Sequence, residues 1–248
     1  MKKTALIQAR MNATRLPGKV LLDLSGKTVL SRVIERVAAS GAVDEICVAT
    51  TDGAADDAIA RCAEKEKVAV FRGSETDVLG RYYGAARQTS ADVVVRVTAD
   101  CPLLDPSLLG DMMERFLQLL KTASADYLSN TLKRTYPRGL DAEIFTFAGL
   151  KQAFQEAKSP HEREHVTPYF YEHPEKFKLA SFEGSLDHSR HRWTLDTGQD
   201  YALISAVYKN LHEPGKIFTT EEALEYLEKH PEILAVNAHI EQKKLTPR

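Results

Sequence analysis

Short apolar runs alternate with helical patterns along the first half of the chain. Four runs rich in apolar and β-branched residues predict strands at Thr4–Gln8, Glu45–Thr50, Val68–Phe71 and Asp92–Val97. Apolar residues at helical spacing follow the first three runs and predict helices over residues 29–37, 55–62 and 76–88, with Asp52 as the cap of the second helix. Strands that alternate with helices predict an α/β fold with a parallel sheet and right-handed crossovers.

The pattern changes after about Ser124. Shorter strand-like segments occur there, with the sequences ADYLSN, DAEIFTF, FKLASFEG and HRWTLDT. Helical spacing predicts helices at Ala148–Ala157, Arg163–Tyr171, Gln199–Leu211 and Thr220–His230. Because we find no repeat, low-complexity tract or long linker, we expect a single domain over residues 1–248 with an elaborated second half.

Composition excludes several classes of protein. The 248 residues are 43% hydrophobic, and the formal net charge of −2 disfavours an extended surface for nucleic acid or anionic membrane. Cys47, Cys62 and Cys101 lack Cys-x-x-Cys spacing and predict free thiols in a reducing cytoplasm. No apolar run reaches about 18 residues and no signal peptide is recognisable, so we expect a cytoplasmic protein without a membrane partner.

Positive charge concentrates in one loop after the first predicted strand. The segment QARMNATRLPGK contains Arg10, Arg15 and Lys19, and Asp100 follows the fourth predicted strand. Ligands of doubly wound sheets bind beyond the carboxyl ends of the strands. Cations suit phosphate oxygens and a carboxylate suits Mg²⁺, so the pattern predicts a phosphorylated ligand with a divalent metal. A G-x-G-x-x-G fingerprint is absent, and Leu21 occupies the first glycine position of a Walker loop.

Six segments in chain order resemble one known family. They are ARMNATRLPGK, RGSETDVLGRYY, VRVTADCPLLDP, YPRGLDAEIF, REHVTPYFY and RWTLDTGQDY. They are similar to the acylneuraminate and KDO cytidylyltransferases, above all to the SpsF-like branch named for spore coat polysaccharide biosynthesis. The resemblance implies a three-layer, Rossmann-like nucleotidyltransferase fold with a mostly parallel sheet. It also implies a homodimer that transfers CMP from CTP to a KDO-like 2-keto-3-deoxy sugar acid, releasing pyrophosphate, for surface polysaccharide biosynthesis.

The resemblance implies a nucleotide-binding half, residues 1–124, with a second metal carboxylate supplied by the other half. Arg10, Arg15 and Lys19 would bind the triphosphate of CTP. Asp100 and Asp196 would bind Mg²⁺, with Asp200 a less certain neighbour of the metal. Arg72 and Arg81 lie in the segment where the family contacts cytosine.

The second half is expected to bind the sugar. Residues 125–215 would supply sugar binding, dimerisation and the second metal carboxylate, and residues 216–248 a C-terminal helix and tail. Arg138 could pair with the substrate carboxylate, and Asp141 could accept hydrogen bonds from sugar hydroxyls. Glu143 enters the same predicted strand, and His165 belongs to the REHVTPY segment. A tight turn with a surface ion pair is the alternative for the YPRGLDAE segment.

Departures from the family pattern and other functions stay open. Ala13 and Val20 replace a serine and a proline of the KDO enzymes, which puts KDO specificity in question. The segment HEREH (161–165) matches the zinc-protease motif H-E-x-x-H, although Pro168 follows too soon for a long helix. A nucleotide-sugar glycosyltransferase would need an Asp-x-Asp pair, which Cys101-Pro102 replaces. A non-catalytic nucleotide-binding pathway protein would have lost the cations or carboxylates, and all of them are present.

Overall fold

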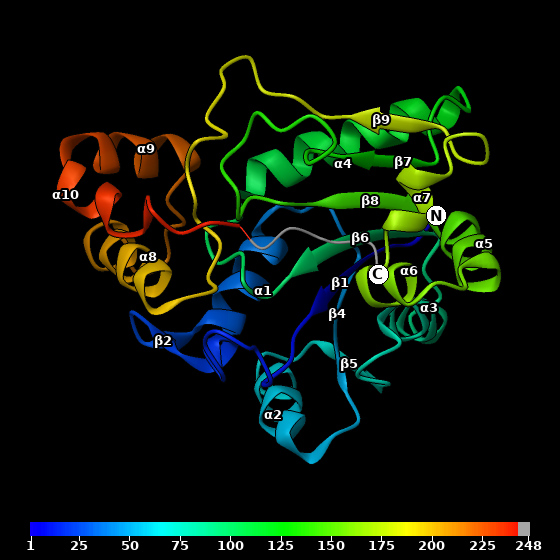
Figure 1. Cartoon of the computed structure of the whole chain (residues 1–248), viewed down its shortest axis with the longest axis horizontal. Coiled ribbons are helices and arrows are strands. Elements are labelled where there is room, and N and C mark those ends of the chain that lie inside the picture. The colour runs from blue at the N-terminus through cyan, green and yellow to red at the C-terminus, as the bar shows by residue number, and fades with distance from the viewer. Residues whose placement is uncertain (243–248) are drawn as a thin grey trace.

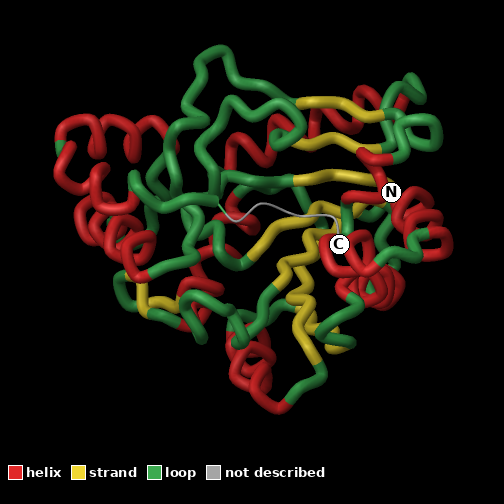
Figure 2. The backbone as a smooth tube through the Cα atoms, in the orientation of Figure 1, coloured by secondary structure: helices red, strands yellow, loops and turns green. Residues whose placement is uncertain are grey.

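Parallel strands form the first half of a central sheet. The computed structural model describes residues 1–242, and its main sheet has seven strands in the order β5-β4-β1-β6-β8-β7-β9 (Figures 1 and 2). The first four strands in chain order are parallel: β1 (Lys3–Gln8), β4 (Glu45–Thr51), β5 (Ala69–Gly73) and β6 (Val93–Thr98). Their carboxyl ends therefore lie along one edge, as the alternation of strands and helices predicts.

The second half of the chain extends the same sheet. β8 (Glu143–Thr146) lies antiparallel between β6 and β7 (Tyr127–Ser129), and β9 (Leu179–Ser181) pairs parallel with β7. A small hairpin of β2 (Asp23–Leu24) and β3 (Lys27–Thr28) stands apart from this sheet. The start of β8 thus lies beside the carboxyl end of β6, because the two strands run in opposite directions.

Helices cover both faces of the sheet. Ala5 and Ile7 of β1 belong to one core cluster, to which α1 (Val29–Ala39), α2 (Asp57–Lys65), α4 (Pro106–Lys121), α8 (Gly198–Leu211) and α9 (Thr220–Lys229) contribute. Leu6 belongs to the cluster on the other face, with α3 (Val78–Gln88), α5 (Phe147–Glu156) and α7 (Pro168–Glu172), while α6 (Pro160–His165) packs against α3. This alternation along β1 is the period of two that a strand buried on both faces requires.

Short helical segments complete the chain. They are η1 (Lys19–Leu21), η2 (Ala54–Asp56), α10 (Pro231–Leu234) and η3 (Ala235–Asn237). In Figure 1, α8, α9 and α10 lie at one end of the molecule and α5, α6 and α7 at the other. No helix within residues 1–242 is both long and apolar enough to cross a membrane. Residues 243–248 of the expected tail lie outside the described residues, and the division of the chain at 124 and 215 stays a prediction.

The fold class is confirmed, but three local predictions are wrong. Asp52 does not cap α2, because η2 intervenes and the helix starts at Asp57. The helix expected at 163–171 is two short helices, since Val166 has a φ of +73° and Pro168 begins α7. The segment HRWTLDT is not a strand: its backbone forms one isolated bridge, between Arg138 and Arg192.

Candidate active site

The basic loop after β1 has a fixed shape. The backbone N–H of Met11 donates to the carboxylate of Asp56 at 2.8 Å, and that carboxylate also accepts from Thr50 and Thr51. Asp56 is 2% exposed, so this anchor is buried. Gly18 has a φ of +72°, which a residue with a side chain rarely adopts, and its N–H donates to the carbonyl of Met11 at 2.9 Å. The loop therefore returns on itself and starts η1 at Lys19.

Lys19 lies between two carboxylates from distant parts of the chain. Its ammonium donates to Asp100 Oδ2 at 2.8 Å, to Asp196 Oδ1 at 2.8 Å and to the carbonyl of Leu195 at 2.7 Å. All three ammonium protons are thus used. Burial opposes the charge, but the two carboxylates outweigh it and raise the pKa of Lys19 above its ordinary value. Lys19 is accordingly a cation enclosed by oxygen atoms.

The turn after β6 presents Asp100 to this cation. The Thr98 hydroxyl donates to Asp100 Oδ1, and the N–H of Cys101 donates to the carbonyl of Thr98. The N–H of Leu195 donates to the carbonyl of Asp100 at 2.8 Å, which brings the segment with Asp196 alongside. Burial favours the neutral carboxyl, yet Lys19 and Thr98 lower the pKa of Asp100. Asp100 is therefore an anion at neutral pH.

Three cations surround Asp196. Besides Lys19, Arg15 Nη2 donates to Asp196 Oδ2 at 2.8 Å and Arg192 Nη2 donates to the same oxygen at 3.1 Å. Asp200, which sequence reasoning left uncertain, is fully buried and accepts from Arg192, from Asn237 and from the N–H groups of Asp196 and Thr197. Its oxygens are occupied by these donors, so Asp200 supports the site and Asp196 faces it.

The two carboxylates fit a divalent cation. One oxygen of Asp100 and one of Asp196 each lie 2.8 Å from the Lys19 ammonium, so a single small cation can bridge them. Mg²⁺ prefers such oxygen ligands and commonly takes only one or two carboxylates, with water and substrate phosphate completing its shell. Within residues 1–242 no cluster of three or more His, Cys, Asp or Glu side chains could hold a metal ion.

Arg81 lies near Arg10 of the basic loop. Arg81 is 1% exposed, and its Nη1 donates to the carbonyl of Ser74 at 2.8 Å. Its Nε and Nη2 are buried with no hydrogen-bond partner in the described chain. Burial lowers the pKa of Arg81, and the charge of nearby Arg10 lowers it further. A buried guanidinium with unused donors beside a second cation is a ready site for a polar ligand atom.

The side chain of Arg72 is held by hydrogen bonds and an ion pair with nearby residues. Its Nε and Nη2 donate to the carbonyls of Thr51 and Gly53 at 2.9 and 2.8 Å, and its Nη1 pairs with Asp57 at 2.7 Å. The guanidinium therefore fastens β5 to the start of α2. The structure does not bring Arg72 to Lys19 and the two carboxylates.

The YPRGLDAE turn lies beside the carboxylates. Asp141 pairs through both oxygens with Arg134, at 2.5 and 3.0 Å, and sequence reasoning did not single Arg134 out. Burial and the charge of Arg134 lower the pKa of Arg138, whereas Asp141 and Asp196 act in the opposite direction. Within residues 1–242 the structure records no side-chain hydrogen bond or ion pair for Arg138. Arg138 is thus the guanidinium of this turn that remains available.

Glu143 lies within the sheet. It is 5% exposed and accepts hydrogen bonds from Arg96 of β6 and from the Tyr127 hydroxyl of β7. Arg96 is its direct cross-strand partner in the β6–β8 register. Glu143 therefore compensates a half-buried arginine beneath the turn that carries Asp141.

His165 lies at the end of α6, apart from the carboxylates. Its ring meets that of His161 edge to face at a centroid distance of 5.1 Å. Glu162, the general base of a zinc-protease reading, accepts from Ser159 in a capping box and contacts His173. The helix spans only Pro160–His165, and within the described residues no third ligand completes a metal cluster. The H-E-x-x-H pattern thus serves helix capping here.

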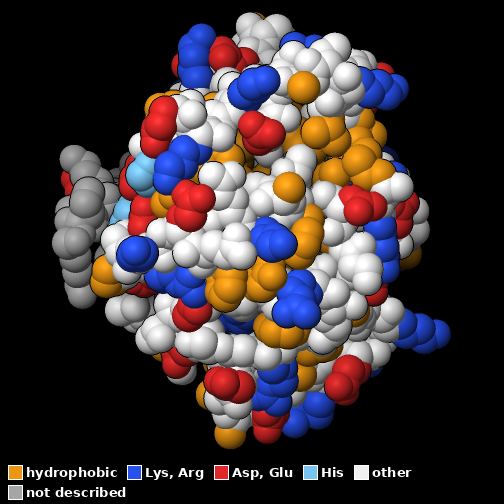
Figure 3. Space-filling model, turned by 90° about the vertical axis from the view of Figure 1, so that its right-hand side faces the viewer, with side chains coloured by type: hydrophobic (Ala, Val, Ile, Leu, Met, Phe, Trp, Pro, Cys, Tyr) orange, Lys and Arg blue, Asp and Glu red, His pale blue; other side chains and the backbone are white. Residues whose placement is uncertain are grey.

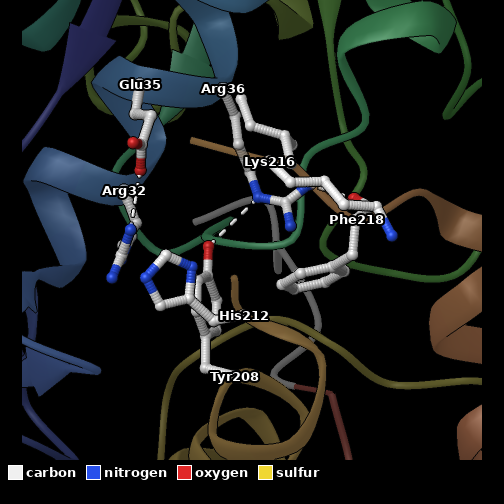
Figure 4. Close-up of a pocket in the computed structure, with 8 residues that line it drawn as sticks. Arg32, Glu35, Arg36, Tyr208, His212, Lys216 and Phe218 are labelled. Carbon is white, nitrogen blue, oxygen red and sulfur yellow. Dashed lines mark hydrogen bonds and ion pairs between the residues drawn. The ribbon is translucent and has the colours of Figure 1, made fainter. Parts of the chain in front are cut away.

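Away from Lys19 and the two carboxylates, a small hollow lies between α1 and the end of α8 (Figure 4). Arg36 fills it, donating to the Tyr208 hydroxyl at 3.1 Å and to the carbonyls of Leu104 and Phe218. Its free volume is about 10 Å³, which accommodates about one water molecule. This cluster joins α1 to the C-terminal half and leaves no room for a substrate.

Arg192 and Asn237 are the site residues that sequence reasoning missed. Arg192 stands four residues before Asp196, inside a quoted motif, and pairs with both Asp196 and Asp200. Asn237 comes from η3 and contacts Arg192 and Asp200. The spacing of Arg192 and Asp196 was a visible signal, but nothing local connects Asn237 to the motif.

Comparisons with known proteins agree with this geometry. Residues 4–243 match the family model described as Cytidylyltransferase. The spore coat polysaccharide biosynthesis protein SpsF of Bacillus subtilis is 31% identical, over 92% of this chain and 94% of that protein. The 3-deoxy-manno-octulosonate cytidylyltransferase of Geobacter metallireducens is 36% identical over 45% of this chain and 43% of its own.

A solved structure matches almost the whole fold. The cytidylyltransferase of Leptospira borgpetersenii serovar Hardjo-bovis superposes with a TM-score of 0.89 at 36% identity, covering 98% of this chain and 99% of that one. The SpsF match covers most of the chain, and the family model, over residues 4–243, includes the basic loop, the turn after β6 and the Asp196 segment. The chain therefore belongs to the cytidylyltransferase family of nucleotidyltransferases.

Proposed function

We propose that this protein transfers CMP from CTP to the anomeric hydroxyl of a 2-keto-3-deoxy sugar acid and releases pyrophosphate, for surface polysaccharide biosynthesis. The observation that carries the proposal is the Lys19 ammonium between Asp100 and Asp196, at the carboxyl ends of the parallel strands. A site that combines several cations with two carboxylates suits a metal-bound triphosphate.

In this structure, the three cations of the basic loop do not yet perform the phosphate binding that we assign to them. Arg15 and Lys19 pair with the carboxylates here, and both can turn towards phosphate oxygens when CTP arrives. Arg10 has no recorded side-chain partner within residues 1–242 and is available at once. These three residues would neutralise the β- and γ-phosphates and stabilise the departing pyrophosphate.

Asp100 and Asp196 would hold Mg²⁺, which polarises the α-phosphoryl oxygen when bound. Their part is to place the α-phosphorus against the sugar hydroxyl, because phosphoryl-type transfer depends on positioning and charge more than on covalent catalysis. Thr98 keeps Asp100 oriented through its hydroxyl, and Arg192 does so for Asp196.

Arg81 would read the base. Its two buried donors without partners suit the carbonyl and ring nitrogen of cytosine. Selective binding of CTP over UTP should therefore weaken in Arg81→Lys, because lysine cannot present two donors in one plane. Arg72, each of whose three nitrogens already has a partner, would support the segment between β4 and α2 instead.

Arg138 would bind the carboxylate of the sugar acid. It is the arginine of the YPRGLDAE turn without a recorded partner, whereas Arg134 is taken by Asp141. Asp141 would then orient sugar hydroxyls through its remaining lone pairs. Glu143 would support this turn from within the sheet, where its carboxylate pairs with Arg96. His165 stays a candidate for substrate binding at the edge of the second half.

The direct test is a panel of nucleotides followed by a turnover assay. Thermal shifts are recorded with CTP, UTP, dTTP, ATP and GTP, each with Mg²⁺ and with chelator. A selective shift with CTP and Mg²⁺ is expected, since a ligand at about 100 times its Kd adds about 2.7 kcal/mol to stability. Pyrophosphate release is then measured with 2-keto-3-deoxy sugar acids. A response to UDP-sugars in place of CTP would point to a glycosyltransferase and contradict the proposal.

Single substitutions test the assigned roles. Arg15→Ala should lower kcat/KM about 10- to 100-fold, because a charge-assisted hydrogen bond contributes roughly 1.5–3 kcal/mol. Asp100→Asn should lower it further, because placement of the metal fails as well. Both are measured by pyrophosphate release at saturating Mg²⁺. Full activity in Asp100→Asn would exclude Asp100 as a metal ligand.

We also propose a homodimer formed through the second half. Tyr83 of α3 stacks on Phe147 and Phe154 of α5 at centroid distances of 5.8 and 4.2 Å, and all three rings are partly exposed. Figure 3 shows this end of the molecule, where hydrophobic side chains alternate with Lys and Arg. A face with exposed aromatic rings among cations has the composition of an interface core with a polar rim.

A further inference from the structure

We infer that the C-terminal segment Ala235–Gln242 is a positioning element of the active site, which acts on Asp196 through Arg192. The inference rests on the proposed function, because it gives Asp196 the task of binding a divalent cation. The segment itself lies outside every sequence motif described above. Figure 1 shows this segment leaving α10 and returning towards the centre of the molecule.

Asp196 needs a partner that stays when substrate binds. At rest its oxygens accept from Lys19, Arg15 and Arg192. Lys19 and Arg15 are the cations assigned to the triphosphate, so both would leave Asp196 during binding. Arg192 is then the one remaining side chain, within residues 1–242, that orients this carboxylate. Asp100 differs, because the Thr98 hydroxyl is its additional partner.

Arg192 itself is fixed by Asp200. Its Nε and Nη2 donate to the two oxygens of Asp200 at 2.9 and 3.0 Å, and the two side chains are 9% and 0% exposed. The same carboxylate accepts from the backbone N–H of Asp196 at 3.0 Å. Asp200 therefore fixes the position of the Arg192 guanidinium, which contacts Asp196, and also the position of the Asp196 backbone.

The C-terminal segment completes this arrangement. Asn237 is 2% exposed, and its Nδ2 donates to the carbonyl of Arg192 at 2.8 Å and to Asp200 Oδ1 at 2.9 Å. The side chain of Gln242 accepts from Arg192 Nη1, the guanidinium nitrogen that no other residue within 1–242 contacts. Every nitrogen of this guanidinium thus has an acceptor. Gln242 supplies one of them directly, and Asn237 holds Asp200, which accepts from two of the nitrogens.

Outer residues of this kind change metal affinity without touching the metal. Loss of a partner that orients a ligating carboxylate typically weakens metal binding about 10- to 100-fold. We expect Arg192→Lys to weaken Mn²⁺ binding in this range, because lysine cannot bind Asp200 through two nitrogens and also reach Asp196. Asn237→Ala should weaken it about tenfold, and Gln242→Ala, which removes one contact at the surface, by less.

The experiment measures Mn²⁺ binding by electron paramagnetic resonance on the full chain, with CTP present and no sugar acceptor. Arg190→Lys, two residues away and exposed, is the control for Arg192→Lys, and Asn210→Ala on α8 is the control for Asn237→Ala. CTP binding in chelator and the melting temperature are recorded for each variant. The expected result is a weaker Mn²⁺ affinity in the three test variants, with the metal-independent binding of CTP unchanged.

Two results would overturn the inference. If Arg192→Lys and Asn237→Ala lower the melting temperature but leave Mn²⁺ affinity unchanged, the segment has a structural role only. If the unsubstituted protein binds CTP in chelator but no Mn²⁺ with CTP present, the metal assignment fails, and the positioning role fails with it. Gln242→Ala keeps the test decisive if the two buried substitutions prevent folding, because its side chain lies near the end of the described chain.

Discussion

At the residue scale, the Lys19 ammonium is the counter-ion of two carboxylates. It contacts Asp100 and Asp196 at 2.8 Å each, and these carboxylates come from two turns at the same sheet edge. Two carboxylates this close to one point repel each other unless a cation lies between them. If Asp100 and Asp196 hold a divalent ion, as we propose, the Lys19 ammonium occupies its position in the absence of nucleotide, and metal and lysine would compete for it.

This competition predicts the behaviour of Lys19→Met. With the ammonium gone, Mn²⁺ no longer has to displace it, and its affinity in the absence of CTP should rise about tenfold or more. Titration of Mn²⁺ followed by electron paramagnetic resonance measures this affinity. Lys27→Met, whose side chain pairs with Glu35 at the surface, is the control. An unchanged affinity in Lys19→Met would argue against a metal between the two carboxylates.

His191 predicts sensitivity to acid. Its ring is 3% exposed, and both ring nitrogens lack a partner within the described residues. Burial lowers the pKa of His191, and the charges of Arg190 and His188 lower it further, with Glu228 opposing them. The unfolded chain then takes up this proton more readily than the folded one. Neutral, buried His191 therefore contributes to the free energy of unfolding. This contribution is fully present above pH 6.5, the ordinary pKa of histidine, and is lost as the pH falls below that value.

The substitution His191→Phe should remove that part of the pH dependence. Unfolding by urea is compared at pH 7.5 and pH 5 for both proteins, and the variant should lose less stability between them. Each tenfold difference in proton affinity corresponds to about 1.4 kcal/mol. His230→Phe, an exposed substitution on the same half, serves as reference. Equal losses in wild type and His191→Phe would show that another group controls this range.

At the element scale, two turns bring the functional side chains together. The first is the basic loop, whose start is bound by Asp56 and whose end turns at Gly18. The second is the turn at Gly139, whose φ is +106° and which packs against the backbone of Trp193. Backbone contact between these distant segments, from the N–H of Trp193 to the carbonyl of Arg138, sets where the Asp196 segment begins.

The second turn predicts a severe effect of Gly139→Ala. An added Cβ would lie 2.4 Å from the carbonyl carbon of Trp193 and 2.5 Å from the nitrogen of Thr194, and backbone atoms cannot yield as a flexible side chain does. We expect a loss of about 3 kcal/mol in the free energy of unfolding, measured with urea.

Gly198→Ala is the matched control for Gly139→Ala. Its Cβ would meet no atom within 4 Å, and it stands at the start of α8, so stability should change by at most about 0.5–1 kcal/mol. If Gly139→Ala were as stable as Gly198→Ala, the close approach to Trp193 would not constrain this turn.

Local patterns predicted elements well and long-range partners poorly. The four parallel strands and α3 follow from apolar periodicity, and Lys19 and Asp100 follow from their places after strands. Helix α4 was missed although Asp105 and Pro106 are ordinary start signals, since Asp105 caps it and proline occupies its first turn. The role of Asp196 was predicted only from the family resemblance, because its partner Lys19 is 177 residues away and no local pattern connects the two. Asn237 had no signal, since only the tertiary structure joins it to Arg192.

At the scale of the whole molecule, one sheet contains strands from both the first and the second half of the chain. β6 binds β1 on one side and β8 on the other, so the turn with Asp100 lies between the basic loop and the YPRGLDAE turn. Periodicity cannot reveal that β8 enters antiparallel, because an antiparallel strand buried on both faces has the same apolar pattern. The order of strands therefore required the structure.

The proposed dimer is tested at this scale. Light scattering should give twice the 27.7 kDa of one chain. Phe154→Asp should shift the protein to the monomer, because a carboxylate in the core of an interface loses its hydration without a partner. Tyr226→Asp on α9, at the opposite end of the molecule, is the control (Figure 1). A monomeric mass for the unsubstituted protein would contradict the proposal.

The contact between Lys19 and Asp196 also has a consequence for synthesis on the ribosome. The chain emerges from its N-terminus, so Lys19 waits for Asp196 while 177 residues are added. At roughly 5–20 residues per second this delay lasts roughly 10–35 s. β1 can pair with β4 and β6 during that time, but an incomplete chain has its basic loop without the second carboxylate. If Asp196 has the role we propose, nascent chains and chains truncated before it would be inactive, because the last quarter of the protein supplies this carboxylate.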